Sequence, residues 1–115
     1  MATLSSHLLN GVDGTHAAQV GMTLTRIAAD GGRELVISAK SDDGGRLTVN
    51  VDTPANARYE MAIASGTYFQ ARKLPRTGMQ IVEEIVIRFS MPDPEARYHI
   101  PVIMSPNSYS CWWSE

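Results

Sequence analysis

Histidines are the residues of this sequence best suited to moving protons, because an imidazole titrates near neutral pH. His7 and His99 each lie in an apolar segment that is typical of a strand, whereas His16 follows the polar loop 10–15. A histidine in an apolar strand is more often a core or interface residue than a catalyst, so both interpretations stay open for these two. His16 is the weakest candidate, since a histidine in a polar loop is ordinarily a solvated turn residue.

Motifs for metal binding and for serine or cysteine nucleophiles are absent. The sequence contains no HxH, HExxH or CxxC spacing and no GxSxG segment. Three scattered histidines could still meet in space, so zinc binding stays open. Cys111, the single cysteine, has no activating context. We therefore expect no cofactor and no metal, with water as the nucleophile of any hydrolysis.

Arg46 and a pair of tryptophans are the other residues with chemistry to offer. Arg46 directly follows the turn sequence 42–45, DDGG, so a tight turn aims its backbone. Its guanidinium either lies in solvent at the edge of a strand or binds a planar, carbonyl-rich ligand through paired donors. Trp112 and Trp113 stand side by side near the end of the sequence. Each can bury about 200 Å² of surface, so they must pack on their own subunit, on another subunit or on a ligand.

Length and composition predict one globular domain over residues 1–115. Hydrophobic residues make up 43% of the 115 and charged residues 19%, which excludes a disordered chain and a membrane protein. No apolar run approaches the roughly 20 residues that span a bilayer. The net charge of -2 does not favour binding to nucleic acid or to anionic lipid. A small neutral-to-anionic ligand is the partner that these numbers leave open.

The single cysteine and the first residues of the sequence indicate the cellular compartment of the protein. One cysteine excludes an intrachain disulfide, so the redox argument for secretion is missing. Residues 1–7, MATLSSH, lack the basic and continuous apolar regions of a signal peptide. We therefore expect a cytoplasmic protein.

The elements that must position these residues are predominantly strands. Alternating polar and apolar residues, separated by glycine-rich turns, predict strands over 23–27, 34–38, 47–51, 59–64, 85–89 and 98–104. Leu24 and Ile27 can share a buried face only if their strand bulges or bends at Arg26. Pro101 cannot donate to a ladder, which places it at an edge, a bulge or a strand's beginning. Helical spacing over 67–74 predicts one short helix, and the fold class is all-β, an antiparallel sandwich.

Several segments, in order along nearly the whole chain, carry a family resemblance. Residues 4–10, LSSHLLN, are similar to an LSxHVLD motif, and residues 43–46, DGGR, to a DGR turn with one glycine added. Residues 59–69 are similar to a strand followed by a TGxYF helix start. Residues 84–89 and 98–106 match the last two strands, the second through a YHVPLLLSP signature. Together they resemble the 5-hydroxyisourate hydrolase family, the transthyretin-related enzymes of purine breakdown.

The resemblance implies a transthyretin-like antiparallel β-sandwich with one short α-helix, assembled as a homotetramer with active sites at the dimer–dimer interface. The family's two motif histidines and its motif arginine correspond to His7, His99 and Arg46. In the family these groups help water attack the C6 carbonyl of 5-hydroxyisourate and open the N1–C6 lactam bond. An imidazole can take the proton from water, and the guanidinium can hold substrate carbonyls and stabilise the oxyanion.

The end of the sequence departs from the family. Family members end in a YRGS tetrapeptide that reaches into the site, and residues 112–115, WWSE, stand in the corresponding place. Polar donors are replaced by apolar, polarisable surface, which tolerates added methyl groups better than it pairs a polar edge. We therefore expect Trp112, Trp113 and Ser114, which is one position off the family serine, to bind an N-methylated 5-hydroxyisourate. Trimethyl-5-hydroxyisourate, from C8 oxidation of the methylxanthine caffeine, is a substrate of family relatives of this sort.

Three other functions compete with this hypothesis. The first is an ordinary 5-hydroxyisourate hydrolase of urate degradation that tolerates an altered tail. The second is a non-catalytic binding protein of transthyretin type, although a binder has no evident need for both histidines and the arginine. The third, a sandwich used only for protein interaction, explains the fold but not the histidines.

Overall fold

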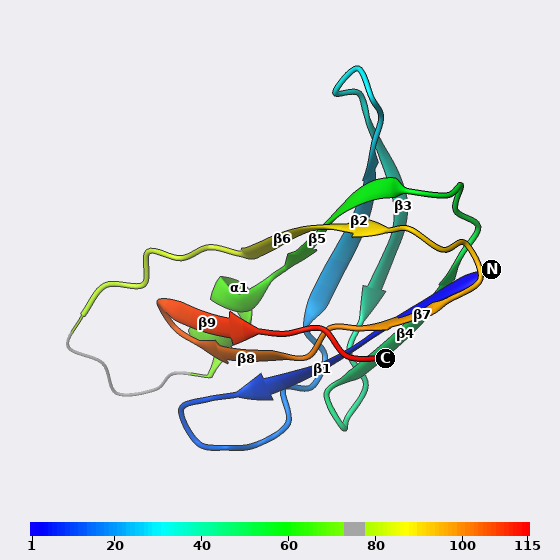
Figure 1. The fold of residues 1–115 in the computed structure, drawn as a ribbon. Helices are drawn as coiled ribbons and strands as arrows, with labels where there is room; N and C mark the ends of the chain where they lie inside the picture. The colour runs from blue at the N-terminus through cyan, green and yellow to red at the C-terminus, as the bar shows by residue number, and fades with distance from the viewer. Residues whose placement is uncertain (73–77) are drawn as a thin grey trace.

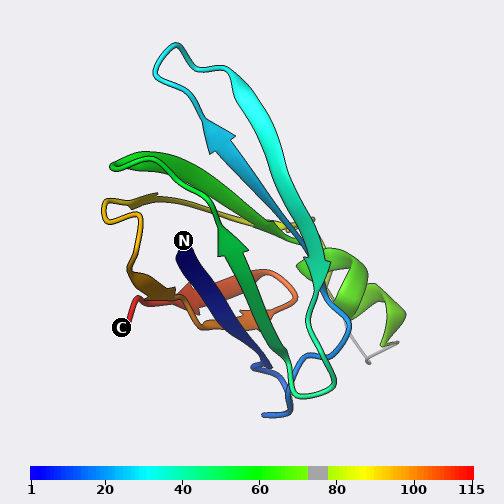
Figure 2. The same ribbon diagram turned by 90° about the vertical axis from the view of Figure 1, so that its right-hand side faces the viewer.

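Two β-sheets pack face to face, as Figures 1 and 2 show in two views at right angles. The computed structural model describes residues 1–72 and 78–115. The first sheet has the order β4-β1-β8-β9, with β7 also paired to β1, and the second has the order β3-β2-β5-β6. The strands of the first sheet are β1 (Ala2–Asn10), β4 (Arg46–Val51), β7 (Arg97–His99), β8 (Val102–Ser105) and β9 (Ser108–Cys111). Those of the second are β2 (Gly21–Ile27), β3 (Arg33–Lys40), β5 (Ala57–Ile63) and β6 (Ile85–Met91).

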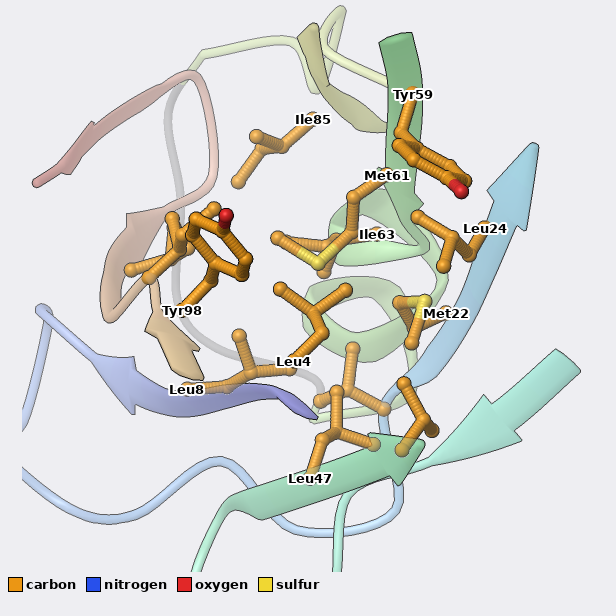
Figure 3. Close-up of a cluster of buried hydrophobic side chains, with 14 of the residues drawn as sticks. Leu4, Leu8, Met22, Leu24, Leu47, Tyr59, Met61, Ile63, Ile85 and Tyr98 are labelled. Carbon is orange, nitrogen blue, oxygen red and sulfur yellow. The ribbon is translucent and has the colours of Figure 1, made fainter. Parts of the chain in front are cut away.

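The core lies between the sheets and is built from alternate residues of each strand (Figure 3). In β1 every second side chain is buried, and the alternation continues without interruption over nine residues. The side chains predicted to point inward from the third and fourth predicted strands are all buried: Leu47, Val49, Val51, Tyr59, Met61 and Ile63. The predicted sandwich of two packed sheets is thus observed, and the other face of β1 is half-buried.

The β2–β3 hairpin is irregular, but not at Arg26, where the residue pattern placed the bulge or bend. Leu24 pairs with Ile37 while Thr25 pairs with Leu35, so the register shifts between Leu24 and Thr25. The extra residue lies on β3, whereas the pairing of β2 with β5 stays regular. Leu24 and Ile27 are nevertheless both buried, as predicted.

Pro101 divides the predicted strand 98–104 into β7 and β8. Proline has no N–H to donate, so the ladder stops there and resumes at Val102. Both halves run parallel to β1, with Ser5 opposite His99 and Leu8 opposite Val102. The sandwich therefore contains parallel pairs beside its antiparallel ones, because the first and last parts of the chain meet in the same sheet.

Helix α1 (Ser65–Ala71) begins two residues earlier than the predicted helix at 67–74, whose last two residues lie outside the described part of the chain. Gly66, the second residue of the helix, packs closely against the backbone of Glu83. Its N–H donates to the Glu83 carbonyl at 3.0 Å, and a Cβ at this position would lie 2.6 Å from that oxygen. Within the described residues, no helix combines the length and the apolar character that crossing a bilayer requires.

Candidate active site

The outer face of β1 brings the predicted catalytic residues together. The inward side chains of β1 are buried, so Ser5 and His7 point to the outside of the first sheet. His7 lies directly opposite Arg46 on β4, and Ser5 lies directly opposite His99 on β7. Residues opposite each other on paired strands share a face. His7, Arg46 and His99 therefore occupy one patch that spans three neighbouring strands, β4, β1 and β7, in Figure 1.

The turn before β4 fixes the position of Arg46. The Asp42 carboxylate accepts hydrogen bonds from the N–H groups of Gly44 and Arg46, both at 2.9 Å. Gly45 has φ +77°, and a Cβ there would lie 2.4 Å from the Leu8 carbonyl oxygen. Only glycine fits this close approach. The tight turn predicted from the sequence thus exists and seats Arg46 beside His7.

His7 is held neutral at physiological pH by its surroundings. Burial lowers the pKa of the His7 imidazole below its ordinary value of 6.5, and the positive charge of Arg46 lowers it further. His16 and His99 add smaller decreases, while a hydrogen bond to the Gly44 backbone raises the pKa. A neutral imidazole keeps a lone pair that can accept a proton. The environment therefore suits a base more than an acid at pH 7.

His16, the weakest candidate from the sequence, stands against His7. Its Nδ1 lies 2.9 Å from His7 Nε2, and the two rings stack with centroids 5.0 Å apart. The loop after β1 brings it there, because His16 forms an isolated antiparallel bridge with Leu9. The sequence did contain a signal for this contact. Asn10 and His16 are separated by a short segment that contains glycines, which lets the chain turn back alongside β1.

His99 is anchored from both sides. A hydrogen bond of 2.8 Å joins its Nδ1 to the Ser5 hydroxyl. Its backbone N–H donates to the Ser114 carbonyl at 3.0 Å, and its carbonyl accepts from the Ser114 N–H at 2.9 Å. Ser5 thus leaves Nε2 as the ring nitrogen of His99 that faces away from β1, and Ser114 lies beside His99 in an isolated antiparallel bridge after β9.

The residues after β9 continue its path along β7. The Trp112 N–H donates to the Pro101 carbonyl at 3.4 Å, and Ser114 pairs with His99. Successive residues of an extended chain face opposite sides, so Trp112 and Ser114 share the outer face with His7 and His99. The indole of Trp112 is 48% exposed there.

Trp113 faces the other way. It lines a pocket of about 680 Å³ at the edge of the sandwich, together with Phe89, Tyr98 and Ile100. This pocket is separate from the imidazole face, so the structure does not bring Trp113 to His7, Arg46 and His99.

Arg46 gives the patch a positive charge. Among residues 1–72 and 78–115, no carboxylate forms an ion pair with Arg46. In the same residues, no three His, Cys, Asp or Glu side chains are grouped so that they could hold a metal ion. Neutral imidazole next to an unpaired guanidinium can deprotonate water and stabilise an oxyanion.

Together, the two sheets, the single helix and this outer face define a transthyretin-like sandwich with a polar site on one sheet. The chain belongs to the HIUase/Transthyretin family, whose sequence profile matches residues 4–113. This confirms the family resemblance.

The relatives and neighbouring structures agree with this membership. A protein of Caulobacter vibrioides named 5-hydroxyisourate hydrolase is 28% identical over 112 residues, covering 97% of each chain. One of Halalkalibacterium halodurans with the same name is 30% identical over 112 residues, covering 95% of this chain and 94% of its own. Both names denote hydrolases, which confirms the prediction of an enzyme of the cyclic-amide hydrolase type.

Two solved structures share the fold. A structure of (S)-allantoin synthase superposes with a TM-score of 0.84 at 26% identity, covering 99% of this chain, which spans only 44% of that longer protein. Klebsiella pneumoniae 5-hydroxyisourate hydrolase superposes with a TM-score of 0.78 at 23% identity, covering 98% of this chain and 99% of its own.

Proposed function

We propose that this protein hydrolyses the lactam ring of 5-hydroxyisourate or of an N-methylated form. The observation that carries the proposal is the pairing of His7 with Arg46 on the outer face of β1 and β4. The names of the relatives from Caulobacter and Halalkalibacterium support the same substrate class.

The chemistry needs a base, a group that stabilises the oxyanion and a group that binds the substrate, and the patch offers each of them. An imidazole of the patch takes a proton from water, and the water oxygen forms a bond to the C6 carbonyl carbon. The carbonyl electron pair moves onto its oxygen, and Arg46 stabilises the resulting negative charge. When the oxyanion collapses, the N1–C6 bond breaks and N1 receives the proton. His99, which Ser5 orients, hydrogen-bonds the substrate or its leaving nitrogen through Nε2.

Trp112 and Ser114 favour the N-methylated substrate within this proposal. They border the outer face next to Pro101 and His99, where an indole offers apolar surface to methyl groups. A buried polar edge left without donors would be costly, whereas added methyl groups gain contact. Contact of Trp113 with the substrate stays a prediction, because in the single chain Trp113 lines the pocket beside Phe89.

A homotetramer would complete this site. The patch lies on an open sheet face, and Trp112 is 48% exposed in the single chain. A second copy against this face would cover the indole and exclude water from the reacting atoms. We place the working enzyme in the cytoplasm, with a purine-derived small molecule as its substrate.

Kinetics on two substrates test the specificity. We expect kcat/KM to be higher for freshly generated trimethyl-5-hydroxyisourate than for 5-hydroxyisourate. The double variant Trp112→Tyr with Trp113→Arg should reverse that preference, and Val12→Asn, an exposed change on the loop after β1, should leave it unchanged.

The competing functions give different results in the same experiment. A clear preference of the unaltered protein for the unmethylated compound would identify an ordinary 5-hydroxyisourate hydrolase of urate degradation. Ligand binding without turnover of either compound would identify a binding protein of transthyretin type.

A further inference from the structure

We propose that His16 is a catalytic residue of this site, and that its Nε2 is the ring nitrogen that takes the proton from the attacking water. The inference rests on the proposed function and deepens it, because it names the imidazole that acts as the base.

Geometry gives the first argument. His7 Nε2 and His16 Nδ1 are 2.9 Å apart, so one nitrogen donates a hydrogen and the other accepts it. The stacked rings, with centroids 5.0 Å apart, hold this contact in one orientation. The Nε2 of His7 is therefore occupied by His16 and is not free to meet water.

The tautomers follow from the second partner of His7. The Gly44 backbone raises the pKa of the His7 imidazole through a hydrogen bond, so its carbonyl accepts a ring N–H. Since His7 Nε2 faces His16, the donating nitrogen is Nδ1. Neutral His7 then carries its proton on Nδ1 and accepts from the Nδ1–H of His16 at Nε2. The lone pair of the His16 ring is left on Nε2.

His16 Nε2 is also the more accessible nitrogen. His16 is exposed whereas His7 is half-buried, and within residues 1–72 and 78–115 no hydrogen bond is formed by His16 Nε2. His7 acts on His16 as the orienting partner acts on the base of a catalytic triad. It fixes the tautomer and accepts the hydrogen bond that stabilises the imidazolium.

The loop that carries His16 is itself tied down. The Asp13 carboxylate accepts hydrogen bonds from the Thr15 hydroxyl at 2.6 Å and the Thr15 N–H at 3.0 Å. Asp13 also pairs with Arg72 at the end of α1, at 3.4 Å. The Asn10 N–H donates to the Thr15 carbonyl at 2.8 Å. His16 is thus held at a fixed place against β1, as a base must be.

The proton balance is simple. Water loses a proton to His16 Nε2 as its oxygen bonds to C6, which gives an imidazolium that donates through Nδ1 to His7. When the N1–C6 bond breaks, the proton on Nε2 passes to N1 and His16 returns to its neutral form. Among the residues that the structure describes, the charged and titratable groups that act on the pKa of His7 are Arg46 on β4, His99 on β7 and His16 on the loop, and each of them is a base.

Two substitutions of His16 separate catalysis from positioning. In His16→Asn the side-chain amide can still donate to His7 Nε2 but offers no base, and His16→Phe keeps a stacked ring without nitrogens. We expect both variants to lose about 100-fold in kcat with little change in KM, while Val12→Asn on the same loop stays at the rate of the unaltered protein. Circular dichroism checks that each variant folds.

Two kinetic results would overturn the inference. The first is that both variants stay within about twofold of the unaltered protein, given the size of a lost general base. The second is that His16→Asn stays active while His16→Phe does not, since His16 would then only donate a hydrogen bond.

A measurement on the unaltered protein keeps the two proposals apart. Imidazole 15N chemical shifts report which nitrogen carries the proton. At a pH at which both rings are neutral, we expect the ring proton on Nδ1 in His16 and in His7. An Nε2–H tautomer at His16 overturns the inference whether or not the protein turns over 5-hydroxyisourate. Absence of turnover together with Nδ1–H at His16 overturns the proposed substrate alone and supports the geometry argued here.

Discussion

His7 and Arg46 face each other across the β1–β4 pair, and the guanidinium lowers the pKa of the imidazole. Replacing Arg46 by Met keeps the length of the side chain but removes the charge. We expect the pKa of His7 to rise toward its ordinary value, measured by an NMR pH titration of the His7 ring. Because we propose that Arg46 also stabilises the oxyanion, we expect kcat to fall by about 100-fold.

The sign of the pH dependence follows from the same contact. A pKa below 6.5 means that His7 binds a proton only at more acidic pH. Activity should therefore hold at pH 7 and decline as the pH falls below 6.5, and the decline should begin at higher pH in Arg46→Met. A His7 titration that is identical in the two proteins would contradict the electrostatic account.

Ser5 orients His99 through the 2.8 Å contact between its hydroxyl and Nδ1. Ser5→Ala removes the partner while the strand and its burial pattern stay. We expect kcat to fall by about 10-fold with KM changed less, because the ring loses its fixed tautomer. Thr3→Val, two residues away on the same face of β1, is the matched control. Equal kcat in all three proteins would remove Ser5 from the site.

Gly45 is required for the approach of the 42–46 turn to β1. Gly45 and Gly31 both have positive φ, +77° and +88°, but only a Cβ at Gly45 meets another atom, the Leu8 oxygen at 2.4 Å. Strain from φ alone costs about 1–3 kcal/mol. We therefore expect Gly45→Ala to lower the free energy of unfolding in urea by more than Gly31→Ala does. A smaller loss at Gly45 would show that the turn can move away from β1.

An ion-pair network on the outer face of the second sheet gives the acid dependence of stability. Hydrogen bonds from Arg33 and Arg88 lower the pKa of Glu60 from 4.5 to about 2. A carboxyl whose pKa is lower in the folded state stabilises that state above 4.5 and loses its effect as the pH falls toward about 2. Glu60→Gln should be less stable than the unaltered protein at pH 7 in urea unfolding, and the difference should shrink below pH 4.5. A difference in the free energy of unfolding that does not vary with pH would contradict this account.

High salt should weaken the stabilisation by Glu60, because the arginines are half exposed.

The alternation of apolar and polar residues predicted most of the strands and the class of fold, because a strand with one buried face buries every second side chain. The same alternation in β1 was enough to put Ser5 and His7 on one face. It could not reveal that β7 lies next to β1, since that pairing joins residues more than ninety positions apart. Residues 98–104 looked like one strand, and the missing N–H of Pro101 broke it in two.

The site was predicted less completely than the fold. His7, Arg46 and His99 were identified through motifs, and the structure places them on one face. The contact of His16 with His7 was not predicted, because it depends on how a loop closes onto β1, which residue types alone do not encode. Trp112 and Trp113 were treated as a pair, whereas an extended chain points neighbours to opposite sides.

The rate of ring opening with and without the protein tests the central claim most directly. The ring opening of freshly generated 5-hydroxyisourate and of its trimethyl analogue is followed in each case against a control without protein. We predict a large acceleration of at least one compound, which His7→Asn reduces by about 100-fold. If neither compound opens faster in the presence of the folded protein than in its absence, the outer face of β1 and β4 is not a hydrolytic site for this substrate class.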